Sequence, residues 1–171
     1  MEELSLWLDG YDDIYSDFDP RGYSKRRISD DFLFELQQAF KYRKERFNKL
    51  LLLLPEERRD ETAEQHITQR LKLFFSQQCQ SWRENYRKKR RNGIIMLSAG
   101  ILIMIINIRL SLIGTSSIPV STIRVFMEPA GWFLLWTAME RLFYELREVR
   151  RQRDVFRELS GLSIGFGNTE K

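Results

Sequence analysis

"GIIMLSAGILIMIINIRLSLIG", residues 93–114, contains a single charged side chain, Arg109, within a run of isoleucine, leucine and methionine. A helix of about 20 predominantly apolar residues is long enough to cross the hydrocarbon core of a bilayer. Buried helices of soluble proteins seldom need so long a run without a polar face. The segment therefore predicts a transmembrane helix, although the mean hydropathy of the whole chain is negative.

A second apolar segment follows the short connection "GTSSIP", residues 114–119. It extends from about Pro119 to Phe143, and aromatic residues fill its middle. Serine and threonine are common in turns, and proline is favoured in the first turn of a helix. We therefore expect a hairpin of two transmembrane helices over residues 93–143, and the second helix is expected to continue without a break into the charged segment after it.

Residues 1–92 predict an N-terminal cytoplasmic region. Ser29 is a good helix cap and is followed by two aspartates, which predicts a helix over residues 29–46. The five leucines before Pro55 are too few to span a membrane and predict a buried strand over residues 47–54. A long amphipathic helix is expected over residues 56–92. The segment before Lys25 is rich in turn formers and is expected to be irregular.

Residues 144–171 predict a cytoplasmic helix followed by a strand. Apolar residues at 162, 164 and 166 alternate with Ser163 and Gly165, the period of a strand. Because this is the only other strand candidate, we expect it to pair with residues 50–54, which requires both termini on one side of the membrane. The expected fold class is a membrane α-helical hairpin carrying a small cytoplasmic α+β domain, mostly helical.

The distribution of positive charge gives the same topology. A basic run precedes the first apolar segment, and more arginines follow the second, whereas the connecting loop is flanked only by Arg109 and Arg124. Because positive residues favour the cytoplasmic side, both termini are expected in the cytoplasm. The expected membrane is a bacterial inner or plasma membrane. The basic run is expected to touch anionic lipid headgroups rather than nucleic acid. It consists of Arg87, Lys88, Lys89, Arg90 and Arg91.

The sequence contains no recognisable catalytic or metal-binding motif. One cysteine, Cys79, and one histidine cannot form an internal disulfide or an ordinary zinc site. The acidic N-terminal segment lacks the spacing of a calcium loop and the basic, apolar pattern of a signal peptide. We therefore expect a protein that is not an enzyme, binds no cofactor, inserts through its own apolar segments, and offers its acidic, aromatic N-terminus to a cytosolic protein partner.

Four polar residues near the far end of the hairpin are the candidate functional site: Asn107, Arg109, Arg124 and Glu128. A charge inside a membrane helix is costly, so it is usually paired or faces water. Arg124 and Glu128 are four apart and are expected to share a helix face. Two interpretations remain open. In the first, the four residues clamp the hairpin together; in the second, several copies assemble and Glu128 and Asn107 line a pore.

The triplet Met127-Glu128-Pro129, at the start of a second membrane helix, resembles the mitochondrial calcium uniporter in motif and topology. That family has a Trp-Asp pair three to four residues before its glutamate. This sequence has Arg124 and Val125 there, so the resemblance implies a topology without calcium selectivity.

A wider resemblance is to a group of small bacterial two-span membrane proteins. The chain is similar to them in an Asp-Pro-Arg turn, then "ISDDFLFEL", an apolar strand ending in proline and a helix ending "LFF". Later positions of the same pattern are Gly131-Trp132, Glu140 and Phe143-Tyr144. The resemblance implies architecture rather than an activity. We expect an oligomeric membrane anchor or sensor, with a small ion pore or membrane-depolarising effector as the alternative.

Overall fold

The structure is a computed structural model that describes residues 2–21, 25–42, 47–113 and 117–169. It is mostly helical, as the sequence predicted, and it contains a small parallel sheet. The chain divides into two compact units. We call Met1–Cys79 together with Asp154–Lys171 the α+β unit, and Gln80–Arg153 the hairpin unit. These boundaries differ from the predicted ones because helices continue through them.

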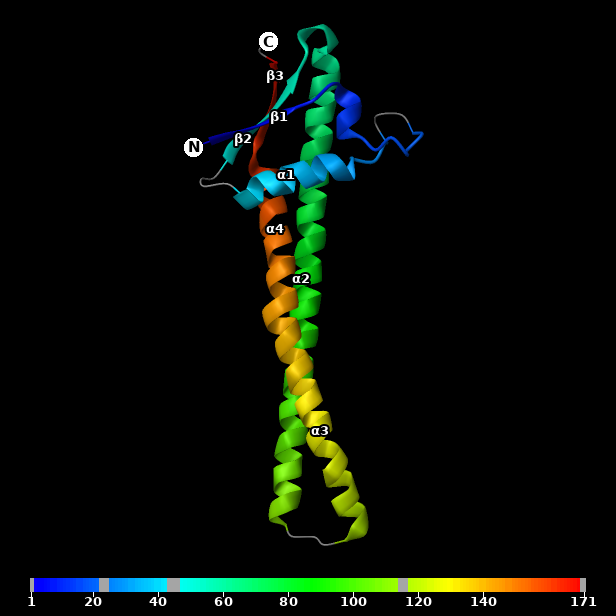
Figure 1. Cartoon of the computed structure of the whole chain (residues 1–171), viewed down its shortest axis with the longest axis vertical. Helices are drawn as coiled ribbons and strands as arrows, with labels where there is room; N and C mark the ends of the chain where they lie inside the picture. The colour runs from blue at the N-terminus through cyan, green and yellow to red at the C-terminus, as the bar shows by residue number, and fades with distance from the viewer. Residues whose placement is uncertain (1, 22–24, 43–46, 114–116, 170–171) are drawn as a thin grey trace. The chain divides into compact units, whose positions relative to one another are not determined.

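The α+β unit contains a three-stranded sheet of order β1-β2-β3, with both pairs parallel. The strands are β1 (Glu2–Trp7), β2 (Phe47–Leu54) and β3 (Ser163–Asn168), shown in Figure 1. Leu50 of the central strand pairs with Leu4 on one side and Ile164 on the other. The leucine strand and its pairing with the C-terminal strand are therefore both present in the structure.

The segment before Lys25 is not irregular as predicted, because it contributes β1 and the 3₁₀ turn η1 (Tyr11–Ile14). Leu4, Leu6 and Leu8 are spaced two apart, and Leu4 and Leu6 pair with Leu50 and Leu52 of the neighbouring strand. Alternate residues of a strand point to one face, so these leucines join the buried side of the sheet. Burial of leucine outweighs the poor strand propensity of the acidic residues around them.

One face of the sheet forms the core of the α+β unit. Leu50, Leu52 and Leu54 are completely buried. The other buried side chains come from η1, from α1 (Asp30–Tyr42) and from the segments of α2 (Glu61–Leu112) and α4 (Leu146–Gly161) that belong to this unit. They include Ile14, Leu36, Leu71, Phe75 and Leu159. The last predicted residues of the first helix, 43–46, lie outside the described residues.

Helix α2 continues through the predicted boundary at residues 92 and 93 without a break. The short 3₁₀ turn η2 (Glu56–Arg58) precedes it, so the helix begins at Glu61 and not at residue 56. The change from charged to apolar composition marks a change of environment for the side chains and leaves the backbone hydrogen bonding unaffected. The return helix α3 (Ile118–Glu140) ends in the π-helical turn η3 (Arg141–Glu145), where the sequence predicted a regular helix.

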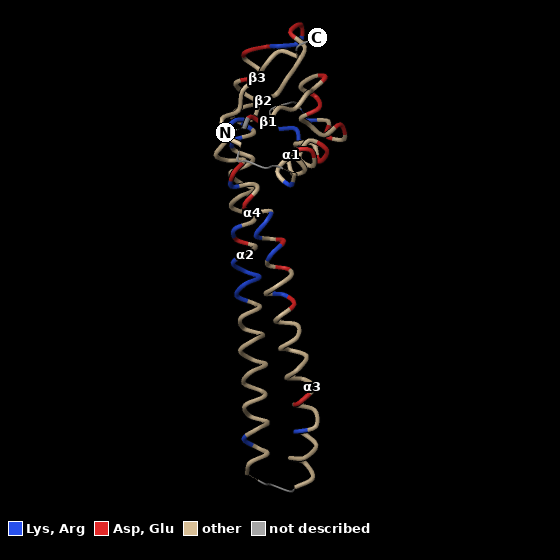
Figure 2. Tube along the Cα trace, turned by 60° about the vertical axis from the view of Figure 1, so that its left-hand side comes forward, with Lys and Arg blue, Asp and Glu red and all other residues tan. Residues whose placement is uncertain are grey.

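Within the hairpin unit, the second half of α2 and the return helix lie side by side and antiparallel (Figures 1 and 2). Glycines mark the contacts between them: Gly93 faces Leu142, Gly100 faces Leu135, and Gly131 faces Met104. Gly100 lies seven residues after Gly93, and its contact Leu135 lies seven residues before Leu142, so the two helices keep one antiparallel register. The same register places Asn107, three residues beyond Met104, level with Glu128, three residues before Gly131.

Candidate functional site

Among the described residues, α2 is the one helix long and apolar enough to cross a membrane. Only 11% of its most apolar 18-residue window is buried within the chain. Helix α3 has 23 residues, which is sufficient length, but Arg124 and Glu128 lower its hydropathy. Figure 2 shows that charged residues are sparse around the loop end of the hairpin and gather toward its other end.

The four polar residues of the candidate site differ in exposure. Glu128 and Arg109 are exposed, whereas Asn107 and Arg124 are half-buried against the hairpin. The Oδ1 atom of Asn107 and the Nε atom of Arg124 are buried and have no hydrogen-bond partner. The structure thus brings Asn107 and Glu128 to one level of the hairpin, and it leaves two buried polar atoms unsatisfied there.

The expected pairing of Arg124 with Glu128 is absent from the ion pairs and hydrogen bonds of the described residues. An acidic residue that precedes a basic one by four positions pairs better in a helix than the reverse order, which this sequence has. Arg124 is half-buried, whereas Glu128 is exposed. The clamp and the pore lining both stay predictions.

Pro129 adds another polar atom beside Glu128. It lies inside α3 and has no N–H to donate, so the carbonyl of Val125 loses the bond of a regular helix. The sequence predicted a kink here. The chemical consequence is that a carbonyl group without its regular helical donor, a carboxylate and a guanidinium lie within one to two turns of each other on the same helix.

The basic run 87–91 lies on α2 about one turn before the apolar residues begin. Four of its five side chains are exposed, and the fifth, Lys89, forms an ion pair of 2.9 Å with Glu145. The hydrogen bond from the Lys89 ammonium lowers the pKa of Glu145. Nearby, the Arg153 guanidinium lies 4.9 Å from the centre of the Tyr86 ring. These contacts join α2 to the return helix where the hairpin becomes charged.

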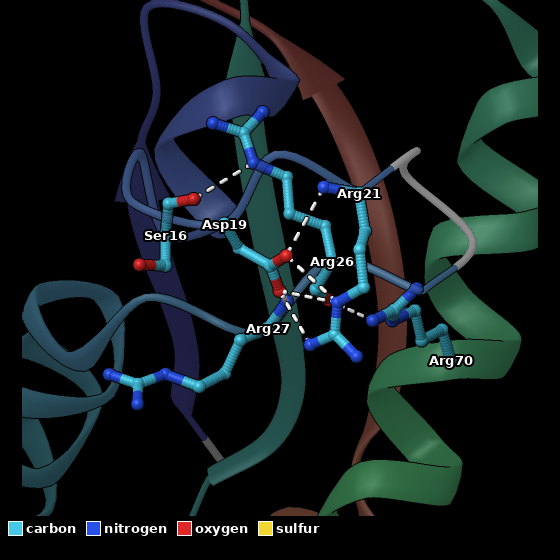
Figure 3. A network of polar contacts seen from close by, with 6 residues as sticks. All are labelled: Ser16, Asp19, Arg21, Arg26, Arg27 and Arg70. Atoms are coloured by element: carbon cyan, nitrogen blue, oxygen red, sulfur yellow. Dashed lines mark hydrogen bonds and ion pairs between the residues drawn. The ribbon is translucent and has the colours of Figure 1, made fainter.

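The acidic N-terminal segment is largely engaged in internal contacts (Figure 3). Asp19 accepts hydrogen bonds from the guanidinium of Arg21, at 2.7 and 2.8 Å, and from the backbone N–H of Arg27, at 2.7 Å. These bonds, of which the Arg21 guanidinium contributes most, hold the pKa of Asp19 well below its usual range. Arg26 donates to the Ser16 carbonyl, and Arg70 of α2 donates to the Arg26 carbonyl. The segment is therefore tied to α2.

A groove of about 770 Å³ lies in the α+β unit, between the tyrosines of the N-terminal segment and the first turns of α2. Tyr11 and Tyr15 line one side, and His66 and Arg70 are among the residues of the other. Backbone N–H of Asp60 donates to the Tyr11 hydroxyl at 2.8 Å, and burial raises the pKa of Tyr11. The groove has no signal in the sequence, because the N-terminal segment has the composition of an irregular segment and no local motif brings it against α2.

The fold and site define a class of protein: a mostly helical chain with a small parallel sheet and one helix of membrane-spanning length and composition. No protein-family model, curated protein or solved structure matches the chain. Both resemblances drawn from the sequence therefore stay predictions. The described residues also contain no cluster of three histidine, cysteine, aspartate or glutamate side chains arranged to hold a metal ion.

Proposed function

We propose that the chain is a non-enzymatic integral membrane protein in which a two-span helical hairpin anchors a small cytoplasmic α+β sensing domain. The observation that carries this proposal is the exposure of the hairpin's apolar surface. The most apolar part of α2 is 11% buried, and Trp132, Phe133 and Trp136 of the return helix are 61–72% exposed. A core helix of a soluble protein would be mostly buried, and an exposed apolar surface of this extent favours contact with lipid.

The contacts between the two helices support α3 as a second span. Small residues at helix interfaces are typical of membrane proteins, because close packing replaces the hydrophobic effect there. A Cβ atom at Gly100 would lie 3.2 Å from the backbone nitrogen of Leu135, so the two backbones approach closely at this glycine. The exposed Phe143 and Tyr144 follow at the level where the basic run begins, as expected of an aromatic belt at the interface. This architecture is also that of the bacterial two-span group.

We propose that both termini lie in the cytoplasm, because positive residues flank the hairpin on both sides and such residues favour the cytoplasmic side of a membrane. Arg87, Lys88, Arg90 and Arg91 are exposed and available to anionic headgroups. A cytosolic protein partner would meet the exposed part of the N-terminal segment, where Phe18 is 97% exposed beside Asp17. The groove of about 770 Å³ falls within the size range of small-molecule sites and supports a sensing role for the domain.

Membrane insertion and topology are tested together with cysteine labelling in intact bacterial cells. Cys79 is expected to resist a membrane-impermeant maleimide, whereas Ser117→Cys in a Cys79→Ser background is expected to react. Permeabilised cells provide the control, because both thiols must label there. Release of the protein by alkaline carbonate, or labelling of Cys79 in intact cells, would overturn the insertion or the orientation respectively.

A second candidate function, an oligomeric ion pore, is favoured by the exposure of Glu128. Glu128 lies ten residues beyond Ile118, about 15 Å along the helix and thus far from the headgroups. A carboxylate at that depth costs several kcal/mol unless a partner or water meets it. Ion flux into liposomes tests the pore. The wild-type protein should conduct, Glu128→Gln should change the cation selectivity, and Arg124→Ala should increase the cation selectivity. Absence of flux from a protein shown to be oligomeric contradicts the pore and leaves the anchor.

A further inference from the structure

The groove of the α+β unit is lined along one side by a single face of α2. The residues that α2 contributes are Ala63, His66, Ile67, Gln69, Arg70 and Leu73. Residues three and four apart on a helix are neighbours on its surface. The side chains of His66, Gln69 and Arg70 therefore lie together within about one turn, and we call them the donor cluster. Leu73 lies next to this cluster, toward the following turn of the helix.

The polar side chains at the other end of the groove, where α2 begins, are engaged inside the chain. The Asp60 carboxylate accepts a hydrogen bond from the backbone N–H of Thr62 at 3.0 Å, as a helix cap does. The Tyr11 hydroxyl accepts from the backbone N–H of Asp60 at 2.8 Å and donates to Glu64 at 3.3 Å. The Arg59 guanidinium donates two hydrogen bonds to Glu64, at 2.8 and 3.0 Å. The acidic groups at this end therefore already have partners.

The donor cluster has hydrogen-bonding capacity left. His66 and Gln69 are exposed, and neither forms a hydrogen bond or an ion pair with another described residue. Arg70 is held in place by its hydrogen bond to the Arg26 carbonyl and by the Tyr15 ring, whose centre lies 5.3 Å from the guanidinium. An imidazole and an amide each present an N–H donor, and a guanidinium is a permanent positive charge. A ligand group that meets all three side chains must accept hydrogen bonds, and Arg70 favours a negative charge on it.

The remaining surface of the groove is apolar. Tyr15 and Ile67 are buried residues that line it, whereas Leu73 is 59% exposed. Covering an exposed leucine with an apolar group is favourable, because apolar surface is removed from water. The volume of about 770 Å³ lies in the range of sites for small organic molecules. A flat apolar body, such as an aromatic ring, therefore suits the part of the groove beside the donor cluster.

We propose that the groove binds a small organic anion, an aromatic carboxylate, with the carboxylate on the donor cluster and the ring against Tyr15 and Leu73. This inference names the ligand class of the proposed sensing domain, so it rests on the proposed function. A cationic ligand would meet the charge of Arg70, and the acidic groups at the far end of the groove already have partners. A simple inorganic anion would use the donor cluster alone and leave Leu73 exposed to water.

His66 is the only histidine of the chain, so the signal of its ring reports on the groove. The full chain, without a histidine tag, is prepared with isotopically labelled histidine in lipid nanodiscs and followed by nuclear magnetic resonance. It is titrated at constant pH with three probes of similar size: naphthoate, naphthamide and naphthylmethylammonium. Empty nanodiscs give the fraction of each probe that enters the lipid, and the free concentrations are corrected for it.

Naphthoate is expected to shift the His66 signal saturably with a Kd of about 1 mM, the affinity of an ordinary ligand of its size. The amide and the ammonium should bind about fivefold more weakly, because neither forms a charge-assisted hydrogen bond with Arg70. Gln69→Glu places a carboxylate in the donor cluster and should weaken naphthoate binding about tenfold, while naphthylmethylammonium still binds and so reports a folded groove. Leu73→Ala should weaken all three probes by about threefold.

Gln77→Glu is the matched control, because it makes the same change at an exposed residue of α2 outside the groove, and it should leave the naphthoate affinity unchanged. Equal affinities for the three probes, no saturable shift with naphthoate, or equal losses in Gln77→Glu and Gln69→Glu would overturn the proposed ligand class. The anchor would still stand if that protein resists carbonate extraction. Release of the protein from carbonate-washed membranes would instead contradict the anchor, and the same titration of the released protein would still decide the ligand class.

Discussion

In the α+β unit, Leu52 is completely buried and the Asp19 carboxylate is held by Arg21 and Arg27, whereas in the hairpin unit Leu102 is 57% exposed and the Oδ1 atom of Asn107 has no partner. The first unit buries a core of leucines and pairs several of its charges. The second unit leaves most of its apolar helix surface exposed. Buried polar atoms without a partner occur in both units, at Gln38 and Thr169 in the first and at Asn107 and Arg124 in the second. The exposed apolar surface of the hairpin unit is the one that the proposed bilayer would cover, and the same helix α2 contributes to both units.

The largest expected effect compares a buried leucine with an exposed one. Leu52→Ala should lower the free energy of unfolding of the α+β unit by about 2–5 kcal/mol, because it removes a core side chain and leaves a cavity. Leu102→Ala should change it by less than about 0.5 kcal/mol, as surface substitutions do. Hydrogen exchange of the β2 amides, measured on the full chain in detergent, gives both values. Similar losses in the two variants would contradict the assignment of Leu102 to a lipid-facing surface.

The second prediction uses two exposed leucines of the same helix, Leu73 at 59% and Leu102 at 57%. A lysine at Leu102 should oppose membrane insertion by about 2.5–3.5 kcal/mol, whereas a lysine at Leu73 should have almost no effect. The measured quantity is the fraction of each variant that stays in carbonate-washed membranes. The comparison between units fails if Leu73→Lys is released as readily as Leu102→Lys.

The third prediction concerns close packing inside the hairpin. A Cβ atom at Gly100 would lie 3.0 Å from the Cδ2 atom of Leu135, whereas one at Gly161 would meet nothing within 4 Å. Gly100→Leu should therefore cost about 1–3 kcal/mol of hairpin packing and separate the helices, and Gly161→Leu serves as the matched control. Pulsed electron paramagnetic resonance measures the distance between spin labels attached at positions Ile95 and Met139 in a Cys79→Ser background, and this distance reports the separation of the two helices. An unchanged distance in Gly100→Leu would mean that the backbones are not in close contact.

The smallest effect is expected at Asp19 and depends on pH. Its folded-state pKa is lowered from the ordinary value of 3.8, chiefly by hydrogen bonds from Arg21. The ionised carboxylate therefore stabilises the fold fully above that value, and the contribution is lost as the pH falls below it. Asp19→Asn should unfold at slightly lower urea concentration than wild type at pH 7, with the difference shrinking below pH 4. Asp17→Asn, which removes a carboxylate of 86% exposure that lies 3.3 Å from the Arg26 guanidinium, is measured alongside as the matched change of charge.

Local patterns predicted much of the fold. The five leucines closed by Pro55 gave a strand whose bounds, Phe47–Leu54, match the structure, and the alternation around Gly165 located β3. The first strand was missed although Leu4, Leu6 and Leu8 alternate in the same way, because acidic and turn-forming neighbours obscured the pattern. A strand that pairs in parallel with a distant segment gains its stability from that partner, and such contacts leave little trace in the local sequence.

The four polar residues of the candidate site could be chosen from the sequence, but their contacts could not. The glycine register of the hairpin places Glu128 level with Asn107. The pairing with Arg124 was not formed, because side-chain direction around a helix depends on how the hairpin packs and spacing alone does not give it. The groove and the hydrogen bond from Arg70 to the Arg26 carbonyl were also beyond the sequence, since they join segments more than forty residues apart.

The π-helical turn has a consequence for how the chain tolerates changes in length. The buried residues of the return helix are spaced seven apart from Gly131 to Ala138, then eight apart from Ala138 to Leu146, across η3. The turn η3 therefore contains one residue more than the seven-residue spacing of the buried positions requires. Removing one residue within 141–145 would let the turn relax to an α-helix with both halves still facing α2. Removing one residue elsewhere in α3 would rotate the helix between the deletion and the turn by about 100°. The π-helical turn η3 is therefore the position in the return helix where a one-residue deletion is best tolerated.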